Sequence, residues 1–156
     1  MAVDRDALAG LMDVALEEAH AALGHDDVPV GAVVARLDSR EVVSRRHNER
    51  ELTHDPTAHA EVLALRDAAA ALGSWRLDEY GLVVTVEPCP MCAGAAVSAR
   101  LGLIAFGAAD PKAGACGSLY NLPSDPRLNH EIEVLDGVRG AESARLLADF
   151  FKARRG

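Results

Sequence analysis

Two short stretches of this sequence contain residues that could bind a metal ion and move protons, His59-Ala60-Glu61 and Cys89-Pro90-Met91-Cys92. One imidazole and two thiolates are ligands that Zn²⁺ accepts, and three protein ligands leave the fourth tetrahedral position open for water. Glu61 follows His59 by two positions, and a carboxylate there could move the protons of that water. We therefore predict a zinc site formed by His59, Cys89 and Cys92, with Glu61 as the catalytic acid–base group.

The two cysteines are expected where a strand ends and a helix begins. Residues 81–86 form an almost wholly apolar run, which is typical of a strand covered on both faces. Pro90 is suited to the first position of the following helix. Cys92 then lies in the first helical turn, three residues after Cys89, so both sulfur atoms can reach one ion. The free N–H groups and positive end of that helix would stabilise thiolates.

His59 is expected early in a second helix, which ends at Gly73. Pro56 or Thr57 would open this helix, with Asp55 or Thr57 as its cap. The acid two positions after His59 would then lie on another side of the helix. It therefore could not be a second ligand of the same ion, although it could reach the water.

The remaining pattern alternates strands and helices after an initial hairpin, which predicts an α/β fold with helices on both faces of a mixed sheet. Leu146, Leu147, Phe150 and Phe151 are expected to point inward from the last helix, and Gly24 is expected to end the first. The expected elements are a helix at 4–23, strands at 28–35 and 41–44, a helix at 56–72, a strand at 81–86, a helix at 90–99, strands at 103–106 and 131–135, and a helix at 141–155.

Length and composition limit the possible classes of protein. A chain of 156 residues favours one domain over 1–156, and it contains no apolar run of the about 18–20 residues that span a bilayer. With no apolar leader after Met1, we expect a cytoplasmic protein without a membrane partner. The net charge of −8 argues against a nucleic-acid partner, but five basic residues between 139 and 156 remain compatible with local phosphate contacts.

A C-x-x-C motif alone is more typical of a redox or structural metal site than of a catalytic one. A redox role would not need His59 or Glu61. A structural site would need a fourth protein ligand, which Cys116, His54 or His130 could supply. The combination of H-A-E with P-C-x-x-C 30 residues later favours a catalytic zinc site. Cys116 is interpreted as a small loop residue, with a redox or extra-ligand role as the less favoured alternative.

The sequence resembles the cytidine-deaminase-like superfamily and, within it, the bacterial tRNA-specific adenosine deaminases. The zinc motif is shared by the superfamily, whereas two segments are similar to the tRNA branch. The resemblance covers nearly the whole chain and rests on residues 28–33, Asn48, His54-Asp55-Pro56-Thr57-Ala58-His59-Ala60-Glu61, residues 87–95, Phe106-Gly107-Ala108, Asp110, Gly114, Gly117-Ser118-Leu119 and Asn129-His130.

This resemblance implies a three-layer α/β/α fold with a five-stranded mixed sheet, and one Zn²⁺ per subunit. It implies hydrolytic deamination of the wobble adenosine in a tRNA anticodon loop to inosine, with Glu61 as base and then acid. It also implies a homodimer in which the partner subunit helps to form the substrate site. The residues expected to contact substrate are Asn48, Val30, Ala58, Asp110, His130 and Phe150, with Lys112, Lys152, Arg154 and Arg155 as further candidates for phosphates.

Two other functions remain open from the sequence. A deaminase of a free nucleobase or nucleoside (cytosine, cytidine or guanine) would share the zinc motif, and the acidic charge favours it. A zinc-stabilised binding module would have four protein ligands and no catalysis. Ammonia release would exclude the binding module, and a comparison of an anticodon stem-loop with free nucleosides would separate the two deaminases.

Overall fold

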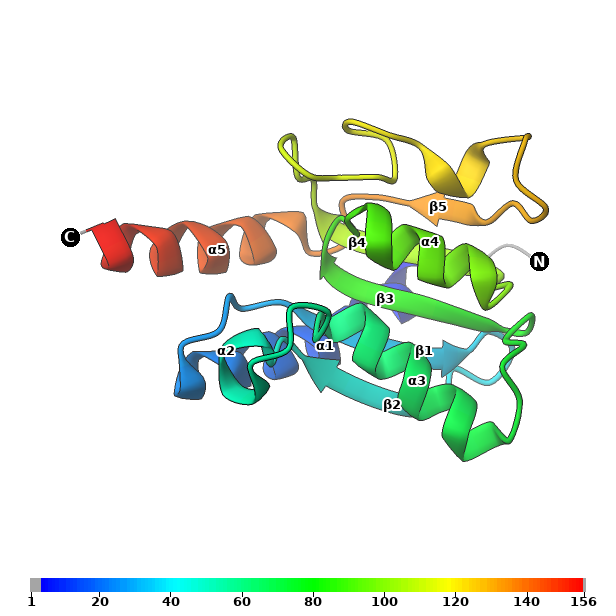
Figure 1. Cartoon of the computed structure of the whole chain (residues 1–156), viewed down its shortest axis with the longest axis horizontal. Helices are drawn as coiled ribbons and strands as arrows, with labels where there is room; N and C mark the ends of the chain where they lie inside the picture. The colour runs from blue at the N-terminus through cyan, green and yellow to red at the C-terminus, as the bar shows by residue number, and fades with distance from the viewer. Residues whose placement is uncertain (1–3, 156) are drawn as a thin grey trace.

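A computed structural model describes residues 4–155 and has three layers, with helices on both faces of one mixed sheet (Figure 1). The strand order is β2-β1-β3-β4-β5. β1 pairs antiparallel with β2 and β3, whereas the pairs β3–β4 and β4–β5 are parallel. The predicted three-layer α/β/α fold with five mixed strands is therefore confirmed. The strands are β1 Gly31–Arg36, β2 Val42–His47, β3 Tyr80–Val86, β4 Leu103–Ala108 and β5 Glu133–Leu135.

The helices divide between the two faces of the sheet. α3 and α4 lie on the face toward the viewer in Figure 1, and α1 lies behind the sheet. α5 starts behind β4 and extends beyond the end of the sheet. The helices are α1 Arg5–Ala22, α2 Arg50–Thr53, α3 Ala60–Leu72, α4 Pro90–Ser98 and α5 Gly140–Arg155, with short 3₁₀ helices η1 Leu23–His25 and η2 Leu122–Ser124. Among residues 4–155, no helix combines the length and apolarity needed to cross a bilayer.

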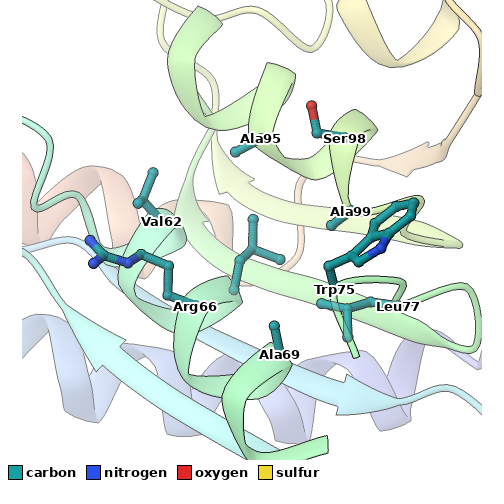
Figure 2. A pocket seen from close by; sticks show the side chains of 9 residues that line it. Val62, Arg66, Ala69, Trp75, Leu77, Ala95, Ser98 and Ala99 are labelled. Carbon is teal, nitrogen blue, oxygen red and sulfur yellow. The ribbon is translucent and has the colours of Figure 1, made fainter. Parts of the chain in front are cut away.

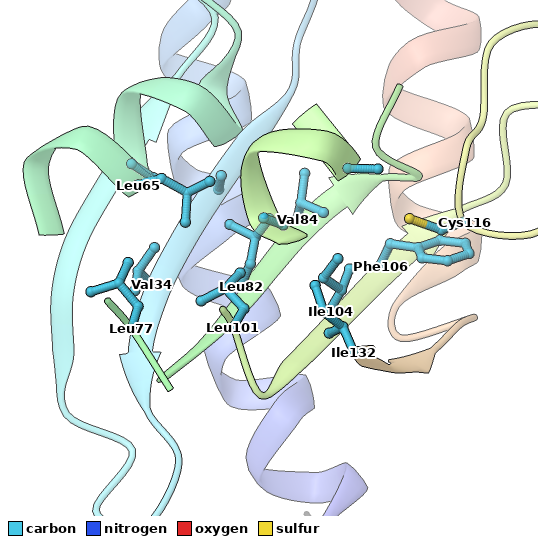
Figure 3. Close-up of a cluster of buried hydrophobic side chains, with 14 of the residues drawn as sticks. Val34, Leu65, Leu77, Leu82, Val84, Leu101, Ile104, Phe106, Cys116 and Ile132 are labelled. Atoms are coloured by element: carbon cyan, nitrogen blue, oxygen red, sulfur yellow. The ribbon is translucent and has the colours of Figure 1, made fainter. Parts of the chain in front are cut away.

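Alternate residues of the central strands enter two separate cores, as the period of two in a strand requires. Figure 3 shows Val34, Leu82, Val84 and Ile104 pointing to the side covered by α3 and α4. The neighbouring residues point to the side covered by α1, namely Val33, Ala35, Val83, Leu103 and Ala105. Since both faces are covered, β3 and β4 are apolar almost throughout, as the sequence predicted.

α1 packs directly on the backbone at the start of β1. A Cβ atom at Gly31 would lie 1.8 Å from the carbonyl oxygen of Ala15, so only glycine allows this approach. The Gly31 N–H donates to the buried Thr85 hydroxyl at 3.1 Å. These contacts fix the segment before β1, which contributes Val28 and Val30 to the cavity described below.

Two predicted helix boundaries were wrong. α3 begins at Ala60 and not at Pro56 or Thr57, because the Asp55 carboxylate binds the N–H and hydroxyl of Thr57 and closes a turn there. The first helix does not stop at Gly24, since η1 continues it to His25 and Asp26 adopts the left-handed conformation. The predicted end of α3 at Gly73 is confirmed by its φ of +66°.

Two further segments differ from the prediction. The expected loop after residue 47 contains α2, because the Asp27 carboxylate accepts the N–H groups of Glu51 and Leu52 in its first turn. The last helix was expected to bury its apolar side, but only Ser143 of α5 is buried, and the Phe151 side chain is 45% exposed. α5 therefore contacts the sheet through its first turns and leaves the rest of its length largely in solvent.

Candidate metal centre and catalytic cavity

The three predicted metal ligands lie together. The Nδ1 atom of His59 is 3.6 Å from the Cys89 sulfur and 3.4 Å from the Cys92 sulfur. Typical Zn–N and Zn–S bonds of about 2.1 and 2.3 Å at the tetrahedral angle separate nitrogen and sulfur by about 3.6 Å. The donor set and its spacing therefore fit a zinc ion.

The electrostatics at the two thiols also favours a bound cation. Hydrogen bonds from the Cys92 thiol and from His59 lower the pKa of Cys89 to about 4. The pKa of Cys92 is raised, because its proton is shared with the Cys89 thiolate and the side chain is buried. Two neighbouring thiolates repel each other, so one ionises at the expense of the other unless a divalent cation binds both.

Both parts of the site are placed by helix starts. Cys89 is the N-cap of α4, so Cys92 lies in its first turn as predicted. His59 is the N-cap of α3 with extended backbone (φ −76°, ψ 146°), which corrects the prediction that it lies within the helix. Because His59 is not helical, Glu61 does not turn away from it. Both line the same cavity.

The Glu61 carboxyl group is buried beside the metal ligands. Its side chain is 4% exposed, and burial raises its pKa to about 7. A carboxyl group with a pKa in this range can both accept and return a proton near neutral pH. The position of Glu61 therefore suits the predicted acid–base role, which stays a prediction.

A cavity of about 220 Å³ opens beside this cluster, and we call it the catalytic cavity. Its walls come from the segment before β1, the end of β2, the starts of α2 and α3, and the segments after β3 and β4. The residues that line it are Val28, Val30, Asn48, Arg50, His59, Glu61, Val86, Glu87, Cys89, Asp110 and Ala113.

Glu87 is a cavity residue to which the sequence analysis gave no role. Its buried carboxylate accepts hydrogen bonds from the N–H groups of Asp110, Cys116 and Ser118 and from the Ser118 hydroxyl. Burial raises the pKa of Glu87, but these donors outweigh burial and hold it below its usual range. A Cβ atom at Gly114 would lie 2.3 Å from the Glu87 carboxyl carbon, so the loop closes tightly around this group.

The position of Glu87 in the sequence already indicated that its carboxylate would need buried hydrogen-bond donors. A carboxylate at the end of an apolar strand must find buried donors, since an unpaired buried charge is costly. Arg50 was missed for a different reason, because it belongs to the unpredicted helix α2.

Asn48 lines the cavity and also holds it together. Its Oδ1 accepts the Ala60 N–H at 2.8 Å, and its Nδ2 donates to the Val28 carbonyl at 3.1 Å. This amide therefore fixes the start of α3 beside the segment before β1. One lone pair of Oδ1 and one N–H of Nδ2 remain for a ligand.

The other predicted substrate contacts are distributed unevenly. Val30 and Asp110 line the catalytic cavity, and Ala58 is buried next to His59. Phe150 instead lines a neighbouring hollow. The structure does not bring His130 to the cavity, since its Nε2 contacts the Leu101 carbonyl before β4, at the opposite end of the sheet.

Within residues 4–155, His59, Cys89 and Cys92 are the only group of three or more potential ligands close enough to share an ion. None of the proposed fourth ligands, namely Cys116, His54 and His130, joins this group. Cys116 packs in the apolar core, where burial raises its pKa to about 12, so its thiol is neither a ligand nor reactive. The small-loop interpretation of Cys116 agrees with this position.

Comparison with known proteins assigns the family. A model of the MafB19-like deaminases matches residues 8–155. The tRNA-specific adenosine deaminase of Bacillus subtilis is 45% identical over 144 residues, which span 92% of this chain and 88% of the relative. This chain belongs to the tRNA-specific adenosine deaminase family.

Solved structures agree with this family assignment. One solved structure comes from work on A-to-I editing by tRNA deaminases at the wobble position. Its sequence is 42% identical to this chain and its TM-score is 0.83, and the match covers 87% of this chain and 97% of that chain. The guanine deaminase of Nitrosomonas europaea also shares the fold, at 25% identity and a TM-score of 0.78, over 89% and 81% of the two chains. The structure from the wobble-position work thus shares more sequence with this chain than the Nitrosomonas europaea guanine deaminase does, while both share its architecture.

Proposed function

We propose that this protein is a zinc-dependent hydrolase that converts the wobble adenosine of a tRNA anticodon loop to inosine and releases ammonia. The observation that carries the proposal is the group His59, Cys89 and Cys92 with buried Glu61 beside it, in a chain 45% identical to a tRNA-specific adenosine deaminase. The three ligands leave one tetrahedral position for solvent.

Zinc held by these ligands would supply Lewis-acid activation of a water molecule. Glu61 would accept a proton from that water and deliver protons to the ring nitrogen and to the departing amine. Burial supports this role, since a dry carboxyl group holds a proton at neutral pH. The Glu87 carboxylate would keep the loop carrying Asp110 in place without taking part in the reaction.

The target base would enter the catalytic cavity unstacked, because a cavity of about 220 Å³ cannot receive a paired base. The free hydrogen-bonding positions of Asn48 could then contact the nucleoside, and Val30 could contact its ring. Ala58 supports this wall from beneath. These residues favour a single-stranded loop over a duplex, as do most sequence-reading RNA proteins.

A hollow of about 200 Å³ adjoins the catalytic cavity and shares Val28, Asn48 and Arg50 with it. Phe150 and Arg154 line its far side, with the guanidinium 4.4 Å from the ring centroid. An aromatic ring with Arg50 and Arg154 beside it suits an unstacked base and its phosphate, although Asp26, Asp27 and Glu51 also line the hollow. We propose that nucleotides next to the wobble position lie in this hollow, with Lys152 and Arg155 near the phosphates. His130 lies away from the hollow and is not part of this proposal.

A single comparison tests the proposed substrate. The zinc-loaded protein is incubated with an anticodon stem-loop carrying a wobble adenosine, and separately with free adenosine, cytidine, cytosine and guanine, while inosine and ammonia are measured. We expect ammonia release with the stem-loop alone. Release from a free base or nucleoside, with none from the stem-loop, would establish the alternative deaminase that the net charge of −8 favours.

We also propose that the protein acts as a homodimer in the cytoplasm, where its substrate tRNA is found. A groove of about 320 Å³ lies between α3 and α4, with Trp75 at its edge 62% exposed (Figure 2). Small residues of α4, Ala95 and Ser98, border it, so a second copy could approach closely. Ala95→Arg should convert the dimer to a monomer in multi-angle light scattering, whereas a dimer retained by this variant would refute this interface.

A further inference from the structure

Four side chains form a continuous hydrogen-bonded chain away from the catalytic cavity. The Nδ1 atom of His25 lies 2.6 Å from an Asp27 carboxylate oxygen, and the Nδ1 atom of His47 lies 2.9 Å from a Glu18 oxygen. The two Nε2 atoms face each other at 3.1 Å. α1, η1 and the end of β2 thus meet through two imidazoles placed between two carboxylates.

The tautomers in this chain follow from the two carboxylates. Each ionised carboxylate can only accept, so each Nδ1 carries a hydrogen and donates it. If both rings were neutral, their Nε2 atoms would present two lone pairs to each other at 3.1 Å. The facing Nε2 atoms of His25 and His47 are therefore placed to hold a cation between them.

The geometry also matches a pair of metal-bound imidazoles. Two Zn–N bonds of about 2.1 Å at the tetrahedral angle separate their nitrogens by about 3.4 Å. Ring centroids 5.2 Å apart with Nε2 atoms 3.1 Å apart mean that the two nitrogens point toward each other. Metal-binding histidines typically donate their other N–H to a carboxylate, as both rings do here.

We propose that His25 and His47 form a second binding site for a divalent transition-metal ion of the Zn²⁺ or Cu²⁺ type, separate from the catalytic centre. Two neutral imidazoles suit these ions, and water completes the coordination. Solvent reaches the site, since the two side chains are 19% and 22% exposed.

The carboxylates behind the two rings are themselves held. Arg45 donates to Glu18 at 2.7 Å, and backbone N–H groups of α2 donate to Asp27, which is 2% exposed. A metal ion on the two imidazoles would therefore tie η1 to the end of β2. Since His47 precedes Asn48, the same ion would stiffen one wall of the catalytic cavity.

Metal counting on the zinc-loaded protein tests the site. The protein is dialysed against increasing free Zn²⁺, and bound zinc is measured by mass spectrometry of the metal. We expect a second zinc per chain, which His47→Gln and His25→Gln lose while keeping the first. Glu18→Gln should weaken the second zinc by about tenfold or more, as loss of a supporting carboxylate does. His20→Gln changes an exposed histidine of α1 and serves as the matched control.

Copper spectroscopy on the same zinc-loaded protein identifies the ligands. One equivalent of Cu²⁺ should give an electron paramagnetic resonance spectrum with hyperfine coupling to two nitrogens, and His47→Gln should remove it. A second zinc retained by both histidine variants would overturn the proposal. So would a stoichiometry that stays at one zinc per chain at saturating Zn²⁺.

Discussion

The two walls of the catalytic cavity are held by different kinds of contact. The inner wall carries Glu61 and Glu87, whose carboxylates are buried, and Glu87 is bound by neighbouring N–H and hydroxyl groups. The outer wall carries Arg50 and adjoins the hollow lined by Phe150 and Arg154, where Arg154 reaches the Asp26 carbonyl from a largely exposed helix. We therefore expect the chemistry on the buried wall and recognition on the exposed one.

This difference has a physical reason. Reacting groups must be held within a fraction of an ångström, which buried and fully satisfied polar groups allow. A substrate loop must enter, unstack a base and leave, so its contacts come from segments with few buried neighbours. Changes to the inner wall should therefore affect turnover, metal binding or stability, and changes to the outer wall should affect only apparent substrate affinity.

The largest effect is expected when a metal ligand of the inner wall is removed. Cys92→Ser replaces a buried thiolate that no other nearby group can replace. Loss of a residue that only supports a ligand can lower metal affinity by about 100-fold. Loss of the ligand itself should lower zinc affinity further, and turnover should fall to background. Zinc content and inosine formation measure both. A variant that keeps its zinc would show that Cys92 is not a ligand.

Glu61→Gln should separate the proton carrier from the metal. The amide keeps the shape of the side chain but cannot accept a proton, so kcat should fall by about 10²- to 10⁴-fold. Zinc content should stay at one per chain. Equal loss of zinc in this variant would mean that Glu61 is a ligand or a structural support.

Glu87→Gln should affect stability more than chemistry. The amide keeps one oxygen for the N–H groups of Cys116 and Ser118 but turns its NH₂ toward the Asp110 N–H, which is left without an acceptor. The free energy of unfolding should fall by about 1–3 kcal/mol, measured by urea denaturation of the zinc-loaded protein. Ser118→Ala removes one donor only and should cost less. Unchanged stability in Glu87→Gln would mean that the loop is held by other contacts.

The outer wall should show the smallest effect, confined to the RNA substrate. Phe150→Ala removes the proposed stacking face, which is worth about 1–3 kcal/mol per base in comparable sites. KM for the stem-loop should rise, while kcat, zinc content and stability stay the same. Arg145→Ala, on an exposed part of α5 outside the hollow, is the control. A fall in kcat without a change in KM would place Phe150 in the core of the fold.

The sequence predicted the inner wall better than the outer wall because local rules determine it. Cys89 and Cys92 are placed by a strand end and a Pro90 helix start, all within a few residues. The start of α3 was mispredicted because the local turn between Asp55 and Thr57 resembles a helix cap, and because Asn48, twelve residues before Ala60, binds the Ala60 N–H. Such distant partners leave no local pattern.

The errors at α2 and α5 also have causes that lie outside the local sequence. α2 is capped by Asp27 from more than twenty residues away, so its four residues read as a loop. The apolar side of α5 predicted burial, yet a helical period shows only that one face is apolar and not what covers it. Phe150 therefore lines a hollow beside the cavity and not a core.

Zinc K-edge X-ray absorption on the resting protein, loaded with a single zinc per chain, tests the central claim most directly, because it counts the ligands of the ion. We predict two sulfur atoms and one imidazole nitrogen from Cys89, Cys92 and His59, with one oxygen from solvent, and an unchanged spectrum in Cys116→Ser. A third sulfur or a second imidazole would fill the position that the reaction needs, and would contradict the proposed hydrolytic function.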